Sequence, residues 1–258
     1  MKARIGVYKF SSCDGCQLAF LNLGETLLAL DELVEISYFA EAGMMDEDTP
    51  VDIAFVEGSI STAADRERIR RIRDHSGRLV TMGACATAGG LQALRNLADA
   101  SAWLADVYAT PEVLDSLDQA LPVAEFVEVD LELWGCPVDS RQLLAAVRSL
   151  LFGVLPPPQR EKLCLECKRQ QAVCVMVTKG EPCMGPVTRS GCGAICPRFG
   201  RACYACYGPA ESPNGSALGR RFEGLGLLPE QVARRFLFIN SHADAFLEAG
   251  QRWMSGHD

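Results

Sequence analysis

Short apolar runs alternate with amphipathic stretches along the first 150 residues of the chain. The apolar runs have the length of buried strands and predict strands at residues 3–9, 34–39, 51–58, 78–84 and 125–133. Apolar residues at helical spacing predict helices at residues 17–31, 65–75 and 139–153, and a mostly helical but interrupted stretch at 90–120. Because strands and helices alternate, we predict an α/β fold with a parallel, doubly wound sheet.

The alternation stops at a run of three prolines, residues 156–158. Proline restricts φ and lacks an N–H, so such a run indicates a domain boundary. Residues 160–215 are rich in Cys, Gly and Pro with little periodicity, and residues 229–253 predict one or two closing helices. We therefore predict an α/β domain at residues 1–155 and a smaller, irregular, cysteine-rich domain at residues 156–258.

The composition is that of an ordinary globular protein with an acidic balance. The 258 residues are 48% hydrophobic and 22% charged, and the net charge is −8, which disfavours nucleic acid as a partner. No stretch reaches the roughly 18 uncharged apolar residues of a membrane span. No secretory or twin-arginine leader pattern precedes the first predicted strand, and Met1 is retained. These features predict a cytoplasmic protein with no membrane span.

Twelve cysteines stand out against this composition. An even number is compatible with disulfides, but disulfide scaffolds are short and poor in core, and the cytosol keeps thiols reduced. In a reducing compartment, this many cysteines indicates metal ligation.

Four of these cysteines directly follow predicted strands of the first domain. They are Cys13 and Cys16 after the first strand, Cys85 after the fourth and Cys136 after the fifth. Parallel strands place their carboxyl ends at one edge of a sheet, where ligands bind, so we expect the four thiols to converge. Four thiolates are the ligand set of an iron–sulfur cluster and also of structural zinc.

Two features favour a cluster over zinc at this edge. Structural zinc usually clips a small region with paired CxxC knuckles, whereas only one such pair is local here. Small neighbours also let backbone N–H groups approach the cluster sulfurs; these neighbours are Gly15, Gly83, Ala84, Ala86, Gly89 and Gly135. The alternative is that Cys85 and Cys136 are only small buried side chains.

The other eight cysteines lie in the second domain and form two sets of four. Cys164, Cys167, Cys174 and Cys183 follow the spacing C-x2-C-x6-C-x8-C, and Cys192, Cys196, Cys203 and Cys206 follow C-x3-C-x6-C-x2-C. Zinc ribbons use comparable spacings. A cysteine followed by proline, as at Cys196, occurs in ferredoxin-type runs, but the x6 spacings do not match the bacterial ferredoxin pattern. The spacing predicts two metal sites and leaves open which metal they hold and how the eight divide.

Five motifs, taken in order, resemble the small, electron-transferring subunit of [NiFe] hydrogenases. They are SCDGCQLAFL, VEGS, GACATAGG, GCPVD and PCMGPVTRSGCGAICP. The similarity is greatest to the delta subunit of cytoplasmic NAD(P)-linked hydrogenases, or sulfhydrogenases, and extends to about residue 210. The gamma-type small subunits of methanogen coenzyme-linked enzymes are also similar. A cluster-bearing subunit of respiratory complex I is similar over the first domain at most.

The resemblance implies a flavodoxin-like first domain and three [4Fe–4S] clusters. It places a proximal cluster on Cys13, Cys16, Cys85 and Cys136, a distal cluster on Cys164, Cys167, Cys174 and Cys183, and a medial cluster on Cys192, Cys196, Cys203 and Cys206. The periplasmic branch has a histidine in place of Cys164 and often lacks a cysteine equivalent to Cys196. We therefore expect three four-iron clusters and no three-iron centre.

All twelve cysteines are then allotted to clusters, which leaves no terminal ligands for a nickel–iron centre. The resemblance thus implies that the Ni–Fe site is on a large-subunit partner and that this chain has no catalytic residues of its own. Electrons would pass through the three clusters to iron–sulfur and flavin (FAD)/NAD(P)-binding partners. The acceptor stays open among NAD, NADP, ferredoxin and polysulfide. Alternatives are a subunit of another multi-subunit oxidoreductase, a zinc-binding structural module and a CxxC dithiol enzyme.

Other polar residues have less specific interpretations. Glu57, in VEGS, either relays protons or shapes the proximal site, or it only caps the next helix. The cations among the second-domain cysteines either tune potential, dock an acidic partner or are solvated surface charge, the last being favoured; they are Lys168, Arg169, Arg198 and Arg201. His75, His242 and His257 lack ligand spacing, so a surface position is expected. GGLQAL, at 89–94, lacks the spacing of a phosphate loop, so no nucleotide is expected here.

Overall fold

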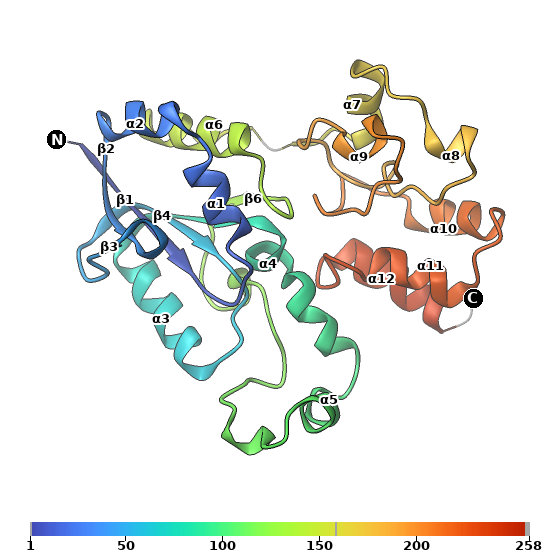
Figure 1. The fold of residues 1–258 in the computed structure, drawn as a ribbon, viewed down its shortest axis with the longest axis horizontal. Helices are drawn as coiled ribbons and strands as arrows, with labels where there is room; N and C mark the ends of the chain where they lie inside the picture. Colours follow the sequence, from blue (N-terminus) through green and yellow to red (C-terminus); the bar gives the residue numbers. More distant parts are fainter. Residues whose placement is uncertain (1, 158, 256–258) are drawn as a thin grey trace. The chain divides into compact units, whose positions relative to one another are not determined.

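The computed structural model describes residues 2–157 and 159–255 of the chain. The chain forms two compact units, Met1–Pro156 and Pro157–Asp258 (Figure 1). Pro158 of the proline run and His257 lie outside the described residues. Of the other two histidines, His75 is exposed, as expected, and His242 is half-buried. Within the described ranges, no helix is long and apolar enough to cross a membrane.

The first unit is built on a six-stranded sheet with the order β3-β2-β1-β4-β5-β6. The strands are β1 (Ala3–Lys9), β2 (Val34–Phe39), β3 (Met44–Met45), β4 (Val51–Glu57), β5 (Ser76–Met82) and β6 (Leu131–Leu133). All neighbouring pairs are parallel except β2 and β3, which are antiparallel. Without the edge strand β3, the parallel strands run 2-1-3-4-5 in chain order, which is the flavodoxin-like arrangement. The predicted fold class is confirmed.

Helices cover both faces of the sheet because its strands alternate apolar side chains between two cores. One core packs against α1 (Gly15–Leu21), α2 (Glu25–Asp31) and α6 (Ser140–Leu151); the other packs against α3 (Ala63–Asp74) and α4 (Gly83–Ala88). In the first core, Phe20 of α1 lies edge-on to Phe55 of β4, with ring centroids 5.3 Å apart. In the second, Tyr8 stacks on Tyr38 at 4.9 Å.

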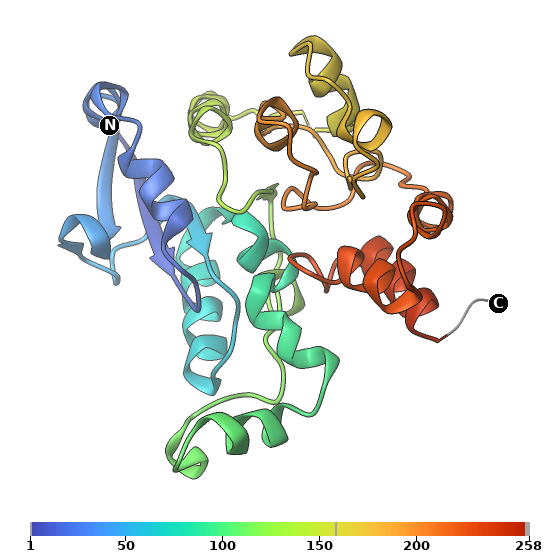
Figure 2. The same ribbon diagram turned by 45° about the vertical axis from the view of Figure 1, so that its right-hand side comes forward.

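The first unit departs from the sequence prediction in one helical stretch and agrees with it in another. The helix expected at 17–31 is split into two: α1 ends at Leu21 and α2 begins at Glu25. Gly24, between them, has a φ of 58°, in the left-handed region that favours glycine, and this conformation breaks the helix. The interrupted stretch at 90–120 contains a 3₁₀ helix, η2 (Gly90–Leu97), then α5 (Ala100–Val107) and a 3₁₀ turn, η3 (Pro111–Val113). Figures 1 and 2 both show α5 at the end of an arm that extends away from the sheet.

The strand predicted at 125–133 is wrong for most of its length. Only Leu131–Leu133 pairs with β5, and a 3₁₀ turn, η4 (Val123–Glu125), stands at its predicted start. Phe126, Val127 and Val129 pack against the core under α3 without a strand partner. Their alternation therefore reflects burial of an irregular segment.

The second unit combines an irregular cysteine-rich segment with a small helical group. Its helices are α7 (Leu163–Arg169), α8 (Val175–Thr178), α9 (Ile195–Arg198), α10 (Gly215–Glu223), α11 (Pro229–Phe236) and α12 (Asp244–Met254). The predicted closing helices are α11 and α12, and α10 was not predicted. Phe236 and Phe246 meet edge-on, with centroids 6.0 Å apart. A Cβ on Gly250 would overlap the Leu237 side chain, so glycine allows α12 its close approach.

Candidate iron–sulfur centres

The first four cysteines lie at the carboxyl edge of the sheet. Cys13 follows β1 and Cys16 is in the first turn of α1; Cys85 is in α4, directly after β5, and Cys136 comes shortly after β6. The strand order reverses between β1 and β4, and the crevice at such a point is where open α/β sheets bind ligands. The fold therefore gathers these thiols at the edge where the sequence placed them.

The thiols at this edge are close enough for the charge of one to raise the pKa of another. Burial is the main cause that raises the pKa of Cys85 to about 12, and the negative charges of Cys136 and Cys13 add to it. Burial also raises the pKa of Cys16, with further contributions from Glu57, Cys85 and Cys136. Buried thiolates that repel one another need a positively charged group to stay ionised. The donor set therefore fits an iron–sulfur cluster, whose irons supply that charge.

Glycines bring the backbone up against these sulfurs. A Cβ on Gly90, where φ is +64°, would lie 2.6 Å from Cys85 Sγ, and a Cβ on Gly83, where φ is +81°, would overlap Cys16 Sγ. A Cβ on Gly15 would lie 3.4 Å from Cys13 Sγ. Gly15 and Gly83 belong to the predicted small neighbours, whereas Gly90 was missed; the Gly-Gly pair at 89–90 was the available signal. We call the backbone of Gly15, Gly83 and Gly90 around these sulfurs the cradle. It has no room for side chains, and a bulky cluster needs such a close approach of the backbone to its sulfurs.

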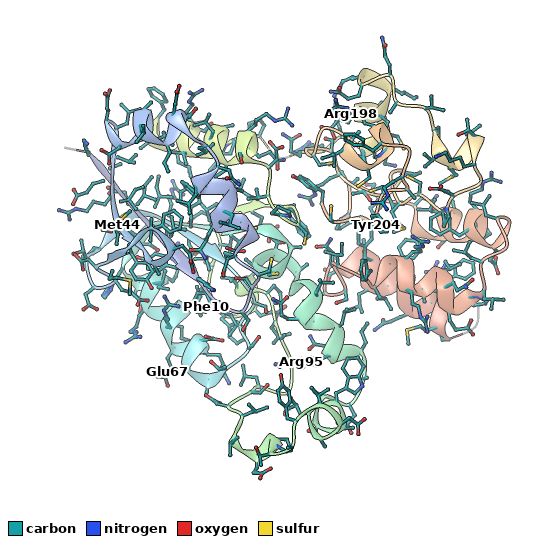
Figure 3. All side chains as sticks on the ribbon, in the orientation of Figure 1. Phe10, Met44, Glu67, Arg95, Arg198 and Tyr204 are labelled. Atoms are coloured by element: carbon teal, nitrogen blue, oxygen red, sulfur yellow. The ribbon has the colours of Figure 1, made fainter. Side chains whose placement is uncertain are left out.

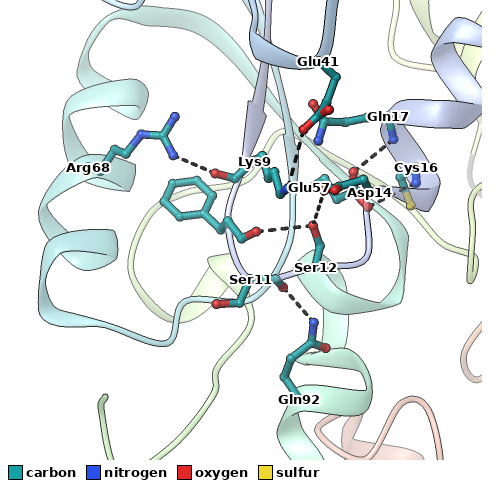
Figure 4. Close-up of polar contacts among 11 residues, drawn as sticks. Lys9, Ser11, Ser12, Asp14, Cys16, Gln17, Glu41, Glu57, Arg68 and Gln92 are labelled. Carbon is teal, nitrogen blue, oxygen red and sulfur yellow. Dashed lines mark hydrogen bonds and ion pairs between the residues drawn. The ribbon is translucent and has the colours of Figure 1, made fainter. Parts of the chain in front are cut away.

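Glu57 caps the helix that carries Cys16. The backbone N–H groups of Cys16 and Gln17 donate to its two carboxylate oxygens at 3.1 and 3.0 Å, and the side chain is 2% exposed (Figure 4). Burial raises the pKa of Glu57, and these two hydrogen bonds oppose the rise. The cap is on α1, some 40 residues upstream, whereas the next helix, α3, is capped by Thr62. The interpretation that Glu57 caps the next helix is therefore wrong: Glu57 caps the preceding α1 and holds the turn that carries Cys16.

Gln92 ties two of the cysteine-bearing segments together and was missed by sequence reasoning. Its side-chain amide donates to the carbonyl of Ser11 at 2.9 Å (Figure 4). The Cys85 thiol donates to its side-chain oxygen at 3.4 Å. The hydrogen bond to Gln92 lowers the pKa of Cys85, against the larger effect of burial. The one signal in the sequence was a polar residue inside the apolar segment GGLQAL.

In the second unit, the first spacing set is brought together. A Cβ on Gly185 would lie 3.5 Å from both Cys164 Sγ and Cys183 Sγ. Burial raises the pKa of Cys167 to about 12, and Cys164, Cys183 and Cys174 add to the rise in that order. These four thiols therefore share one neighbourhood.

The second spacing set, Cys192, Cys196, Cys203 and Cys206, is not cleanly separated from the first. Burial raises the pKa values of Cys192 and Cys203, and Cys196 and Cys206 respectively contribute from within the set. Cys183, however, also contributes to the raised pKa of Cys196 and accepts a hydrogen bond from the Cys203 N–H at 3.2 Å. Cys183 thus lies at the border of both sets. In the part of the chain that the structure describes, no three His, Cys, Asp or Glu side chains are grouped to hold a single metal ion.

Glu166, inside the C-L-E-C motif, holds the loop that carries Cys192. Its carboxylate accepts hydrogen bonds from the N–H groups of Gly191 and Ala194, each at 3.2 Å. It links α7, which bears Cys164 and Cys167, to the second set of cysteines. Sequence reasoning did not single out this residue.

The protein thus combines a flavodoxin-like sheet, with thiols gathered at its carboxyl edge, and a cysteine-rich unit. This combination is that of an iron–sulfur protein, and comparison with known proteins identifies the family. Residues 13–150 match the family described as NADH ubiquinone oxidoreductase, 20 Kd subunit. The sulfhydrogenase 2 delta subunit of Pyrococcus furiosus is 35% identical over 90% of this chain and 97% of its own length. A subunit of the F420-non-reducing hydrogenase of Methanococcus voltae is 29% identical over 87% of this chain and 89% of its own.

Among solved structures, a chain of an NAD+-reducing [NiFe]-hydrogenase in the H2-reduced state is 30% identical to this protein. It superimposes with a TM-score of 0.57 over 61% of this chain and 96% of its own. The chain belongs to the small-subunit family of [NiFe] hydrogenases, as its five motifs predicted. It is an electron-transfer subunit of the oxidoreductase class.

Proposed function

We propose that this chain relays electrons through three [4Fe–4S] clusters, from the Ni–Fe site of a large-subunit partner to a flavin- and NAD(P)-binding partner. The observation that carries the proposal is the arrangement of twelve cysteines, four of which are gathered at the carboxyl edge of the sheet near its switch point. The other eight lie in one compact unit. A relay of fewer four-cysteine clusters would leave at least four of the twelve cysteines without a role.

The proposed ligands keep the division that the resemblance implies. They are Cys13, Cys16, Cys85 and Cys136 for the proximal cluster, Cys164, Cys167, Cys174 and Cys183 for the distal cluster, and Cys192, Cys196, Cys203 and Cys206 for the medial cluster. Cys183 also contacts the second set, through the hydrogen bond from the Cys203 N–H. The assignment of cysteines to the distal or the medial cluster is therefore the part of the proposal that most needs a test. When bound, such clusters supply one-electron transfer.

The chain's own residues would position these ligands and exclude water from them. Cys16, Cys183 and Cys203 are at most 8% exposed, so their sulfurs are shielded from solvent. Glu57 holds the first turn of α1, and with it Cys16, through two backbone hydrogen bonds. Hydrogen bonding and burial around the sulfurs are the means by which a protein sets the potential of an iron–sulfur site.

Partners supply what this chain lacks in the proposal. The nickel-bearing large subunit would hold the H2-converting site, so the isolated chain would not oxidise H2. The similarity to a chain of an NAD+-reducing enzyme supports an NAD(P)-linked acceptor. FAD on a further subunit and a cytoplasmic location complete the proposal. The relative described as F420-non-reducing leaves room for another acceptor.

The test is the iron, zinc and acid-labile sulfide content of the anaerobically purified chain. Three four-iron clusters require about twelve iron and about twelve sulfide per chain, with a brown colour. About three zinc without sulfide would replace the electron relay with a structural zinc protein, since zinc is colourless and redox-inert. Oxidation of H2 by the chain without a nickel-bearing partner would refute the division of labour between the subunits.

A further inference from the structure

The cysteine-bearing segment of the second unit is basic although the whole chain is acidic. Residues 164–206 contain six Lys or Arg side chains and two Glu, a net charge of +4, whereas the chain carries −8. The positive charge therefore coincides with the eight cysteines. Local charge of one sign around a redox site steers partners of the opposite sign.

Much of this positive charge is not neutralised within the molecule. Glu166 is engaged with the backbone of the Cys192 loop, and Arg169 pairs with Glu161. Lys168 and Arg198 are exposed, and within residues 2–157 and 159–255 neither forms an ion pair. Arg198 is on α9 (Figure 3). These side chains are available to carboxylates from outside.

Exposed apolar side chains occur in the same part of the chain as these cations. Val173 is 67% exposed, Val177 on α8 is 79% exposed and Phe199, directly after α9, is 76% exposed. Single exposed apolar residues are ordinary, whereas an exposed apolar group next to a hollow is typical of an interaction site.

A hollow of about 300 Å³ lies between the segment that precedes and includes α8 and the segment around α9. Its lining includes Val173, Lys179 and Arg198. Lys179 Nζ donates to the carbonyl of Gly200, which also lines the hollow, at 2.8 Å and so joins the two sides. The exposed Lys168, Val177 and Phe199 lie within two residues of a lining residue in the sequence. We call these three side chains, together with Val173, Lys179 and Arg198, the basic apolar face.

We propose that the basic apolar face docks the electron-accepting partner through an acidic surface of that partner. Carboxylates would pair with Lys168 and Arg198, and an apolar side chain would enter the hollow beside Val173. An acidic protein fits because the face joins unneutralised cations to apolar area, which steers association and then excludes water. This inference rests on the proposed electron-relay function and adds the site and the charge of the partner.

The test uses the hydrogenase purified with its partner subunits through a tag on this chain. In the variant Lys168→Glu/Arg198→Glu, we expect flavin per nickel at 0.15 M salt to fall at least about fivefold, because the reversed charges repel the acidic partner. Iron per chain and H2-dependent reduction of benzyl viologen, a small dye that does not need the partner, stay at wild-type levels. The matched control is Arg220→Glu/Arg221→Glu, which makes the same charge change at exposed positions of α10.

Each other outcome overturns the docking proposal in a distinct way. Flavin retained at wild-type level in the variant means that the partner binds elsewhere. Loss of nickel together with flavin assigns the face to the nickel-bearing partner, and equal loss in the control means that only overall charge matters. If the variant loses iron, Lys168→Gln/Arg198→Gln and Phe199→Ser take its place under the same criteria. A wild-type preparation without iron–sulfur clusters would refute the electron-relay function, irrespective of docking.

Discussion

Replacement of Gly90 by alanine tests the cradle of the proximal cysteines most directly. A Cβ at this position would lie 2.6 Å from Cys85 Sγ and 2.9 Å from Cys85 Cα. Non-bonded heavy atoms rest roughly 3.5–4.0 Å apart, so the sulfur or the backbone must move by about 1 Å. Ligand positions at a metal site tolerate about 0.2 Å. We therefore expect Gly90→Ala to abolish the proximal cluster while the other two sites remain.

The assay is iron and sulfide per anaerobically purified chain. The loss of one of three four-iron clusters lowers iron from about twelve to about eight. Gly153→Ala is the matched control, because Gly153 has a similar φ of +72° but nothing within 4 Å of the added Cβ. The control shares the cost of a left-handed alanine, about 1–2 kcal/mol, without the clash.

The result that would refute the reasoning is Gly90→Ala with the iron content of the wild type. Equal iron loss in Gly90→Ala and Gly153→Ala would assign the effect to backbone strain alone. Loss of all the iron in Gly90→Ala would mean that the three sites do not assemble independently.

Three further substitutions test other contacts. Glu57→Ala leaves the N–H groups of Cys16 and Gln17 without an acceptor and should cost the metal-free chain about 2–4 kcal/mol in urea unfolding, with Glu57→Gln intermediate; unchanged stability would contradict the cap. Burial raises the pKa of Asp130, but hydrogen bonds from the backbone and two arginines outweigh it and lower the pKa. The contribution of Asp130 to folding stability is therefore present above the unfolded pKa of about 3.9 and lost as pH falls through the folded pKa. In that window, Tm should depend less on pH in Asp130→Asn than in the wild type; parallel curves of Tm against pH for the two proteins would refute this. Gly250→Ala should lower the free energy of unfolding by about 1–3 kcal/mol through overpacking, which is seen as a lower Tm. Leu237→Ala in the same chain should offset part of the loss; strictly additive effects would contradict the contact.

Local patterns in the sequence determined most of the first unit. The strands at 3–9, 34–39 and 51–57 follow from short apolar runs, because burial on both faces leaves a direct trace in composition. The gathering of Cys13, Cys16, Cys85 and Cys136 followed as well, since parallel strands place their carboxyl ends at one edge whatever their order. Family membership came from five ordered motifs without any structural information.

Contacts between distant segments were decided by the tertiary structure. Glu57 reaches Cys16 because β1 and β4 are neighbours in the sheet, and strand order has no local signature. Apolar and polar residues alternate along 125–133 as they do in a strand, because this periodicity reports which side chains are buried. Whether such a segment pairs as a strand depends on a neighbouring strand with free backbone groups, and only Leu131–Leu133 finds one in β5. The border position of Cys183 depends on how irregular loops fold over one another, where spacing counts residues but cannot measure distance.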